Sequence, residues 1–316
     1  MEPLAGILVV DFTRYLPGPF ASRELLERGA RVVRVETPDG DPLREVAPGW
    51  DAALNAGKES VVWDLERDPD LGRALCARAD VVLEGFRPGV TERLGVGAAD
   101  VPESVVYCSI TGFGAGDRRV GHDLNYSGWA GLLDDTAPAL PPVQIADLAG
   151  GALYALVEIL AALLERERTG RGRHITVSMT HNAYRLAAHR LHGEPERTLT
   201  GGLACYRIYE TADGRFLTIT PVEPKFWQRL CELIGRQDLV GRQYEDDQAA
   251  LAAELAGVFR ARALDHWLDL FEGEDVMAGP VATLAEAAEW LGEQHIPGSP
   301  PALGEHTDEW RASFEG

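Results

Sequence analysis

Segments that read as buried strands alternate with helix-like segments along the first third of this chain, and that alternation constrains the fold more than any other feature. Residues 6–12 form a near-continuous apolar run, which is typical of a parallel strand buried on both faces. Residues 20–28 follow as a helix that ends at Gly29. Repetition of this pattern predicts a Rossmann-like α/β domain, with a mostly parallel sheet between helices. Further strands are expected at residues 31–36, 60–65, 81–86, 105–110 and 174–179.

A second, smaller unit is expected from about residue 200, where the repeated strand–helix pattern gives way to short strands around a turn. Short strands are predicted on either side of the turn Asp213-Gly214, and helices after them. Residues 199–294 are therefore predicted to form a small α+β domain. Residues 1–198 form the expected large domain, to which the proline-rich, extended tail at 295–316 returns. The small domain's elements are expected at residues 206–210, 216–220, 224–234 and 249–263.

The charge of the chain limits what it can bind. The formal net charge is −20 at pH 7, whereas nucleic acid or an anionic membrane would require a basic face. The longest apolar run meets Glu165 and Arg166 and is too short to span a bilayer. Scattered cysteines and the absence of a secretory pattern favour reduced thiols. We expect a cytoplasmic protein with neither nucleic-acid nor membrane partners.

Several common motifs find no support. The turn at residues 112–116 (GFGAG) follows a strand, but its third glycine comes one residue too early for a dinucleotide-binding loop. A glycine-rich turn beneath a ligand is the better interpretation. His181, His189 and His192 lie on a helical stretch expected to end near His192, at spacings that do not suit a metal ion, so no metal site is expected.

His122 is the first candidate for acid–base chemistry. It follows a predicted strand, in the region where an α/β sheet places its ligand crevice. The ordinary pKa of histidine suits a general acid or base near neutrality. From the residues alone, a plain loop histidine is equally compatible with this position.

Asp147 and Glu223 are carboxylates near predicted helix starts. Asp147 precedes a glycine pair, at residues 150–151, where the longest predicted helix (148–168) begins. It either caps that helix or lies in a tight site, in which the glycines admit a ligand and burial tunes its pKa. Glu223 allows a similar interpretation, as a carboxylate favoured by the helix dipole.

Several segments together form a family pattern. They are residues 4–11 (LAGILVVD), 17–19 (PGP), 29–36 (GARVVRVE), 54–58 (LNAGK), 84–90 (EGFRPGV), 94–97 (LGVG) and 303–309 (LGEHTDE). With them, the whole chain resembles the family III CoA-transferase superfamily, and within it the bacterial 2-methylacyl-CoA racemases. Residues 128–142 and 190–201 are short by comparison, and both border the expected acyl pocket.

The resemblance implies a reaction. In the racemases, a histidine at the position of His122 and an aspartate at that of Asp147 exchange the α-proton of an acyl-CoA thioester, and a glutamate matching Glu223 supports the histidine. The family's transferases instead use the aspartate as a nucleophile, through a mixed anhydride and then a thioester. They usually carry an aromatic residue in place of the histidine.

An α-methylacyl-CoA racemase of lipid and fatty-acid metabolism is therefore expected, with coenzyme A present as part of its substrate and no other cofactor. A family III CoA-transferase that works through Asp147 is the alternative. A degenerate CoA-binding homologue with a regulatory role is a third hypothesis, against which the intact catalytic residues argue.

The resemblance also implies a binding site and an assembly. CoA would lie across the carboxyl ends of the strands, with Arg34 and Lys58 at its adenosine or phosphate groups and Arg87 beside the pantetheine and diphosphate. Interlocked homodimers would place Glu223 at the partner's site. The start of the helix after Asp147, or backbone amides near residues 150–151, would supply the donors to the enolate oxygen. The other expected contact residues are Tyr15, Leu16, Phe86, Asp123 and Tyr126.

Overall fold

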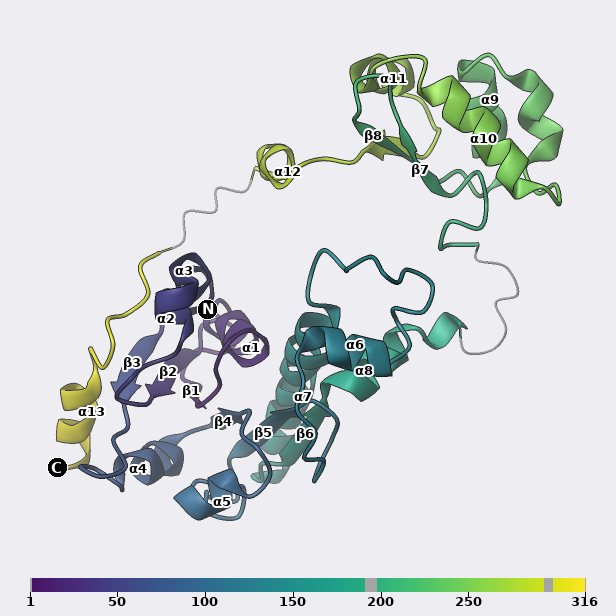
Figure 1. The fold of residues 1–316 in the computed structure, drawn as a ribbon. Coiled ribbons are helices and arrows are strands. Elements are labelled where there is room, and N and C mark those ends of the chain that lie inside the picture. Colours follow the sequence, from purple (N-terminus) through teal and green to yellow (C-terminus); the bar gives the residue numbers. More distant parts are fainter. Residues whose placement is uncertain (1, 191–197, 293–297, 316) are drawn as a thin grey trace. The chain divides into compact units, whose positions relative to one another are not determined.

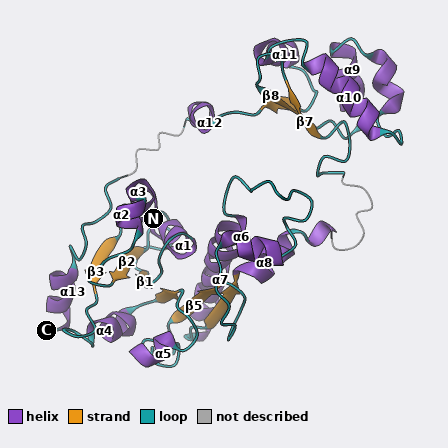
Figure 2. Ribbon diagram, viewed as in Figure 1, coloured by secondary structure: helices purple, strands orange, loops and turns teal. Residues whose placement is uncertain are grey.

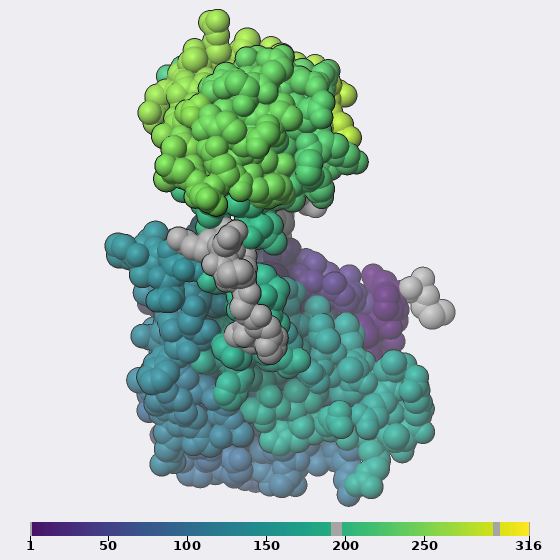
Figure 3. Space-filling view, turned by 90° about the vertical axis from the view of Figure 1, so that its right-hand side faces the viewer, coloured from purple at the N-terminus to yellow at the C-terminus, as the bar shows by residue number. Residues whose placement is uncertain are grey.

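The computed structural model describes residues 2–190, 198–292 and 298–315, and it divides the chain into two compact units. Unit 1 comprises Met1–Ala188 and Ile296–Gly316, and unit 2 comprises His189–His295. Each unit is a closely packed body in the space-filling view (Figure 3). The expected domain boundary at 294/295 and the expected helix end at His192 lie outside the described residues.

Six parallel strands form the sheet of unit 1, in the order β3-β2-β1-β4-β5-β6 (Figures 1 and 2). Every neighbouring pair is parallel, which confirms the predicted α/β fold. The second strand has the bounds that the sequence predicts, and the others differ only at their ends. The strands are β1 (Leu8–Asp11), β2 (Arg31–Glu36), β3 (Glu59–Val62), β4 (Val81–Glu84), β5 (Val106–Thr111) and β6 (His174–Ser178).

Helices cover both faces of this sheet. In unit 1 they are α1 (Pro17–Leu26), α2 (Leu43–Val46), α3 (Pro48–Asn55), α4 (Leu71–Arg78), α5 (Val90–Leu94), α6 (Asp123–Trp129), η1 (Ala146–Leu153), α7 (Tyr154–Thr169), α8 (Met179–Leu186) and α13 (Thr307–Phe314). A 3-10 turn, η2 (Ala188–Arg190), follows α8. Because successive side chains of a strand point to opposite faces, Val9 and Val81 join the core under α1 and α7. Val10 and Val82 join the core that contains residues of α4 and α13.

The C-terminal segment closes the edge of the sheet at β3. The backbone N–H of Ser60 donates to Nδ1 of His306 (3.2 Å), and the N–H of His306 donates to the Ser60 carbonyl (2.9 Å). The indole of Trp310 donates to Glu59 (2.7 Å). The expectation of an extended tail is therefore wrong beyond its prolines: α13 forms because its buried Trp310 packs on the sheet.

Unit 2 is an α+β body around an antiparallel sheet in the order β7-β8-β9. Its core includes Trp227, Phe259 and Trp267. The sequence did not predict β9, whose residues Ala-Gly-Pro have low strand propensity. The elements are β7 (Arg207–Glu210), β8 (Phe216–Ile219), α9 (Pro224–Leu233), η3 (Gln237–Arg242), α10 (Gln248–Phe259), α11 (Leu264–Phe271), β9 (Ala278–Pro280) and α12 (Leu284–Leu291).

The helical stretch Ala146–Thr169 begins with a π-helical segment, η1, and continues as the α-helix α7. The sequence predicted a single helix over residues 148–168. An 18-residue window of the stretch has a mean hydropathy of 1.7, so the helix is long and apolar enough to cross a membrane by length and composition alone. In unit 1 it packs against α1 and α8, and core helices of globular proteins pass the same test.

Gly150 is the point at which η1 packs directly on α8. A Cβ there would lie 2.7 Å from the Met179 carbonyl oxygen and 3.1 Å from the Ala183 nitrogen. Both are backbone atoms, so a whole helix must shift. We expect Gly150→Ala to lower the free energy of unfolding by about 1–3 kcal/mol in urea denaturation. The control is Gly257→Ala in α10, where a Cβ meets nothing within 4 Å; equal stability of both variants would contradict the close packing.

Candidate active site

A cavity of about 690 Å³ lies in unit 1 at the carboxyl ends of the strands. Its walls come from the segments that follow β1, β4 and β5, and from Met179 at the end of β6. The strand order reverses direction between β1 and β4, and open α/β sheets bind their ligands at such a switch point. The cavity is therefore where this fold is expected to place an active site.

The structure brings most of the predicted site residues together here. Glu223 belongs to unit 2, where it is exposed and precedes α9 as its N-cap residue without a side-chain capping bond. Its action on a partner's site stays a prediction. The predicted residues that line the cavity are Tyr15, Phe86, Arg87, His122, Tyr126 and Asp147.

His122 lies at the start of α6, with its backbone extended (φ −124°, ψ 177°). Its N–H donates to Oδ1 of Asn125 at 3.0 Å, which fixes the entry into the helix. Tyr126 donates its hydroxyl hydrogen to the Gly121 carbonyl. A Cβ at Gly112 would lie 2.5 Å from the Tyr126 ring, so this position of the glycine-rich turn needs glycine for close packing. The His122 side chain is thus carried at the cavity by an anchored loop.

Asp147 is the second residue of η1, and π-helical turns frequently occur at functional sites. Its backbone N–H donates to Oδ1 of Asp123 at 2.9 Å. Its own Oδ1 is buried and has no hydrogen-bond partner among the described residues. Burial, and then the charge of Asp123, raise the pKa of Asp147 to about 7. The side chain caps no helix, so the structure favours the second sequence interpretation, a tight site with a tuned pKa.

Close packing on α8 accounts for the glycine pair after Asp147. Gly150 packs on the backbone of α8, and a Cβ at Gly151 would lie 3.0 Å from the Met179 side chain. The Gly150 carbonyl accepts a hydrogen bond from Asn182 (2.9 Å). Neither glycine lines the cavity. This packing gives no support to the expectation that amides near residues 150–151 face the reacting carbonyl, which stays a prediction.

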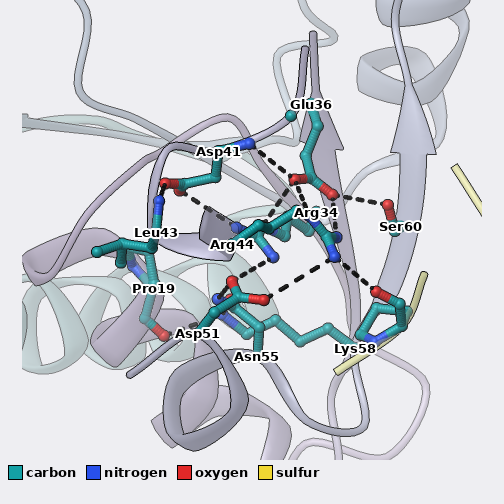
Figure 4. A network of polar contacts seen from close by, with 12 residues as sticks. Pro19, Arg34, Glu36, Asp41, Leu43, Arg44, Asp51, Asn55, Lys58 and Ser60 are labelled. Atoms are coloured by element: carbon teal, nitrogen blue, oxygen red, sulfur yellow. Dashed lines mark hydrogen bonds and ion pairs between the residues drawn. The ribbon is translucent and has the colours of Figure 1, made fainter. Parts of the chain in front are cut away.

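Arg34 and Lys58 lie in a buried network of charges (Figure 4). The guanidinium of Arg34, only 1% exposed, is 2.8 Å from Asp51, 3.2 Å from Asp41 and 3.5 Å from Glu36. These acids already neutralise the cation. Neither basic side chain lines the cavity, so the phosphate contacts that the resemblance implied would require this network to open.

Lys58 has its donors occupied. Its ammonium donates to the Pro19 carbonyl (2.9 Å), to the Ser22 hydroxyl (2.7 Å) and to Asn55 (2.8 Å). Burial lowers the pKa of Lys58 to about 8, although the charge of Asp11, 3.7 Å away, acts in the opposite direction. An ammonium has three donors, so no N–H remains for a ligand in this structure.

The network instead supports the cavity wall. Asp11 accepts the backbone N–H of Thr13 (2.8 Å), and Asp41 accepts that of Tyr15 (3.4 Å). Tyr15 has a φ of 65°, a left-handed conformation that is uncommon for a residue other than glycine. Of the remaining predicted contacts, Leu16 precedes α1 as its N-cap residue, and Asp123 is buried behind Asp147; neither lines the cavity.

Three arginines that the sequence analysis missed, Arg14, Arg118 and Arg119, line the same cavity. Arg119 pairs with Asp117 (2.7 Å) and lies 4.1 Å from the centre of the Phe113 ring. Arg14 and Arg118 make no ion pair or side-chain hydrogen bond within the described part of the chain. The pair Arg118-Arg119 just after the GFGAG turn was the available signal, because a glycine-rich turn followed by cations suits an anionic ligand.

Fold and cavity together define a doubly wound α/β enzyme, with acid–base groups at its switch point. The family model described as CoA-transferase family III matches residues 4–307, and the chain belongs to that family. Its closely similar relatives include both racemases and CoA-transferases, so family membership alone fixes the class of enzyme and not the reaction.

Two curated relatives illustrate this. The alpha-methylacyl-CoA racemase of Homo sapiens is 34% identical over 308 residues, which cover 90% of this chain and 78% of the relative. The succinyl-CoA:glutarate CoA-transferase of Mus musculus is 31% identical over 322 residues, covering 90% and 73%. A crystal structure of Rv3272 from Mycobacterium tuberculosis matches with a TM-score of 0.85 at 30% identity, covering 98% of this chain and 99% of that one.

Proposed function

We propose that this chain is an α-methylacyl-CoA racemase, which inverts the 2-methyl stereocentre of acyl-CoA thioesters by proton transfer between two bases. The observation that carries the proposal is the pair at the cavity: an imidazole, His122, and a carboxyl, Asp147, whose pKa is about 7. A group that must give a proton in one direction and take one in the other works best when its pKa is close to the ambient pH.

In one direction, neutral His122 removes the α-hydrogen as a proton, and the electron pair of the broken C–H bond forms the enolate of the thioester. Protonated Asp147 then donates its proton to the opposite face of the α-carbon. The product has inverted configuration, with His122 as imidazolium and Asp147 as carboxylate. Exchange with solvent restores the starting protonation states. The opposite direction uses the same two groups with their roles reversed.

The CoA portion of the substrate would meet the cavity's arginines. Arg14, Arg87 and Arg118 provide cations for its phosphates in a chain whose overall charge is −20. No redox cofactor or metal enters the reaction as proposed, and the enzyme would act in the cytoplasm.

The proposal includes a homodimer in which Glu223 of one subunit supports His122 of the other. Exposed apolar surface along the helical stretch Ala146–Thr169 supports the homodimer. This surface comes from the side chains of Leu153, Val157 and Leu164. Such surface on a core helix is typical of an interface.

CoA transfer between carboxylic acids is the second candidate. The observation in its favour is that Asp147 lines the cavity and that its Oδ1 atom has no hydrogen-bond partner among the described residues. A carboxylate with a free oxygen is able to attack a thioester.

Deuterium incorporation separates the two reactions. A 2-methylacyl-CoA thioester is incubated with the protein in heavy water, without a second acid, and the α-carbon is analysed for deuterium and for chirality. We expect exchange with loss of chirality, and a fall in the racemisation rate of roughly 10²- to 10⁴-fold in His122→Ala. His266→Ala, an exposed histidine of unit 2, is the control. Full activity of His122→Ala, or CoA transfer to an added acid without exchange, would overturn the proposal.

A further inference from the structure

Asp123 is placed to act on Asp147 without touching the ligand. It is the first residue of α6, its side chain is 8% exposed, and it does not line the cavity. Its Oδ1 accepts the backbone N–H of Asp147 at 2.9 Å, across 24 positions of sequence. The geometry therefore gives no support to its expected role as a CoA contact. It supports a role in which Asp123 acts on Asp147.

The hydrogen bond fixes a part of the chain that the helix cannot hold by itself. The first N–H groups of a helix have no intrahelical acceptor, and Asp147 is at the second position of η1. Asp123 supplies the missing acceptor from a neighbouring element. The two candidate bases are joined by the same contact, because Asp123 directly follows His122 in the sequence. The contact thus ties the backbone of Asp147 to the segment that carries His122.

The charge of Asp123 is the second part of its effect. The elements packed against η1 carry other titratable side chains. They are Arg23 and Glu24 on α1, Tyr107 and Cys108 on β5, His122 and Tyr126 at α6, Tyr154, Glu158, Glu165, Arg166, Glu167 and Arg168 on α7, His174 on β6, and His181, Tyr184 and Arg185 on α8. Among the described groups, the Asp123 carboxylate is the one whose charge acts on Asp147, and it does so beside the effect of burial. A second carboxylate nearby makes ionisation of Asp147 less favourable.

We propose that Asp123 is a positioning residue for the proton transfer: its carboxylate accepts the backbone N–H of Asp147 and holds that residue in place at the cavity. Its charge raises the pKa of Asp147 in the same direction as burial, which is the larger cause. The inference rests on the proposed function of Asp147 as an acid and base. It adds a residue that neither contacts the substrate nor exchanges its proton.

The conservative variant separates position from charge. In Asp123→Asn the amide oxygen can still accept the Asp147 N–H, but the charge is removed. We expect the pKa of Asp147, followed by carbon NMR of its carboxyl group, to fall below that of the wild type. The limb of the kcat/KM–pH profile that reports this group should move to lower pH in parallel. Glu158→Gln makes the same change of charge at an exposed position of α7. We expect it to leave the pKa of Asp147 and the kcat/KM–pH profile unchanged.

Asp123→Ala removes the hydrogen bond as well. Its kcat should fall at least tenfold below that of Asp123→Asn at the pH optimum of each, with KM for the thioester changed less than twofold, because the residue does not line the cavity. A pKa of Asp147 unchanged in Asp123→Asn, or equal kcat in the two variants, would overturn the inference. If instead Asp147→Asn racemises as fast as the wild type, the proposed function fails, whereas the NMR titration still tests the contact.

Discussion

An Asp147→Asn variant is expected to lose racemisation by roughly 10²- to 10⁴-fold and, at the same time, to become more stable than the wild type at pH 8. The loss follows because an amide neither gives nor takes the proton. The gain follows from the environment of the carboxyl, whose Oδ1 is buried without a partner among the described residues and which lies beside Asp123. One substitution should therefore separate the group's chemical role from its cost to the fold.

The pH dependence has a definite sign. Folding raises the pKa of Asp147 from 3.8 to about 7, so the folded state favours the protonated form. Asp147 costs no stability below about pH 4; the cost grows between about pH 4 and pH 7 and levels off above pH 7 at about 4 kcal/mol. The uncharged asparagine escapes this cost. Urea unfolding of both proteins should therefore give similar stabilities near pH 4 and a more stable variant at pH 8.

Glu158→Gln provides the matched control, since it removes an exposed carboxylate from the helix that continues from η1. We expect its stability to follow the wild type at both values of pH. If Asp147→Asn gains no stability between pH 4 and pH 8 relative to that control, the carboxyl ionises freely in the fold, and its use as a proton donor near neutrality loses its physical basis.

Arg34→Ala is expected to destabilise unit 1 by about 3–5 kcal/mol, because it leaves buried carboxylates without a cation. Asp41 and Asp51 would lose their nearest guanidinium partner, and Asp41 also holds the strained turn at Tyr15. Arg31→Ala on the same strand is the control. Arg31 is exposed and pairs with Glu59 at the surface, so its loss should cost about 1 kcal/mol or less.

The measurement also decides between two roles for Arg34. Thermal unfolding without ligand is compared with CoA binding measured by calorimetry below the unfolding temperature. A structural role predicts a large loss of stability, with binding weakened only as the cavity wall loosens. A phosphate ligand predicts weakened CoA binding while the fold keeps the stability of the Arg31 variant, and that result would contradict the network as described.

The strands of unit 1 could be predicted because each is a short apolar run, and burial on both faces imposes that composition whatever the tertiary detail. The bounds of β2 agree with the prediction for this reason. The π-helical start at Ala146 could not be predicted, because an extra residue in one turn leaves the apolar pattern nearly unchanged. The helix at the C-terminus was missed since it depends on Trp310 finding the distant strand β3.

The site divides in the same way. His122 and Asp147 were identifiable because residue type, local context and family pattern agree, and the structure brings both to one cavity. The burial of Arg34 could not be identified from the sequence, because its acidic partners Asp41 and Asp51 come from other segments of the chain. Sequence spacing does not show which charges neutralise each other in three dimensions.

The anchoring of His306 and Trp310 on β3 has a consequence for biosynthesis. The ribosome completes β3 early, yet the segment that covers its edge emerges only after all of unit 2, residues 189–295, has been made. Ser60 and His306 are 246 residues apart, so at common elongation rates of about 5–20 residues per second that interval is roughly 12–50 s. During this time the nascent chain carries an open strand edge, which is a template for pairing with another chain. A premature stop before the codon of His306 would make that exposure permanent.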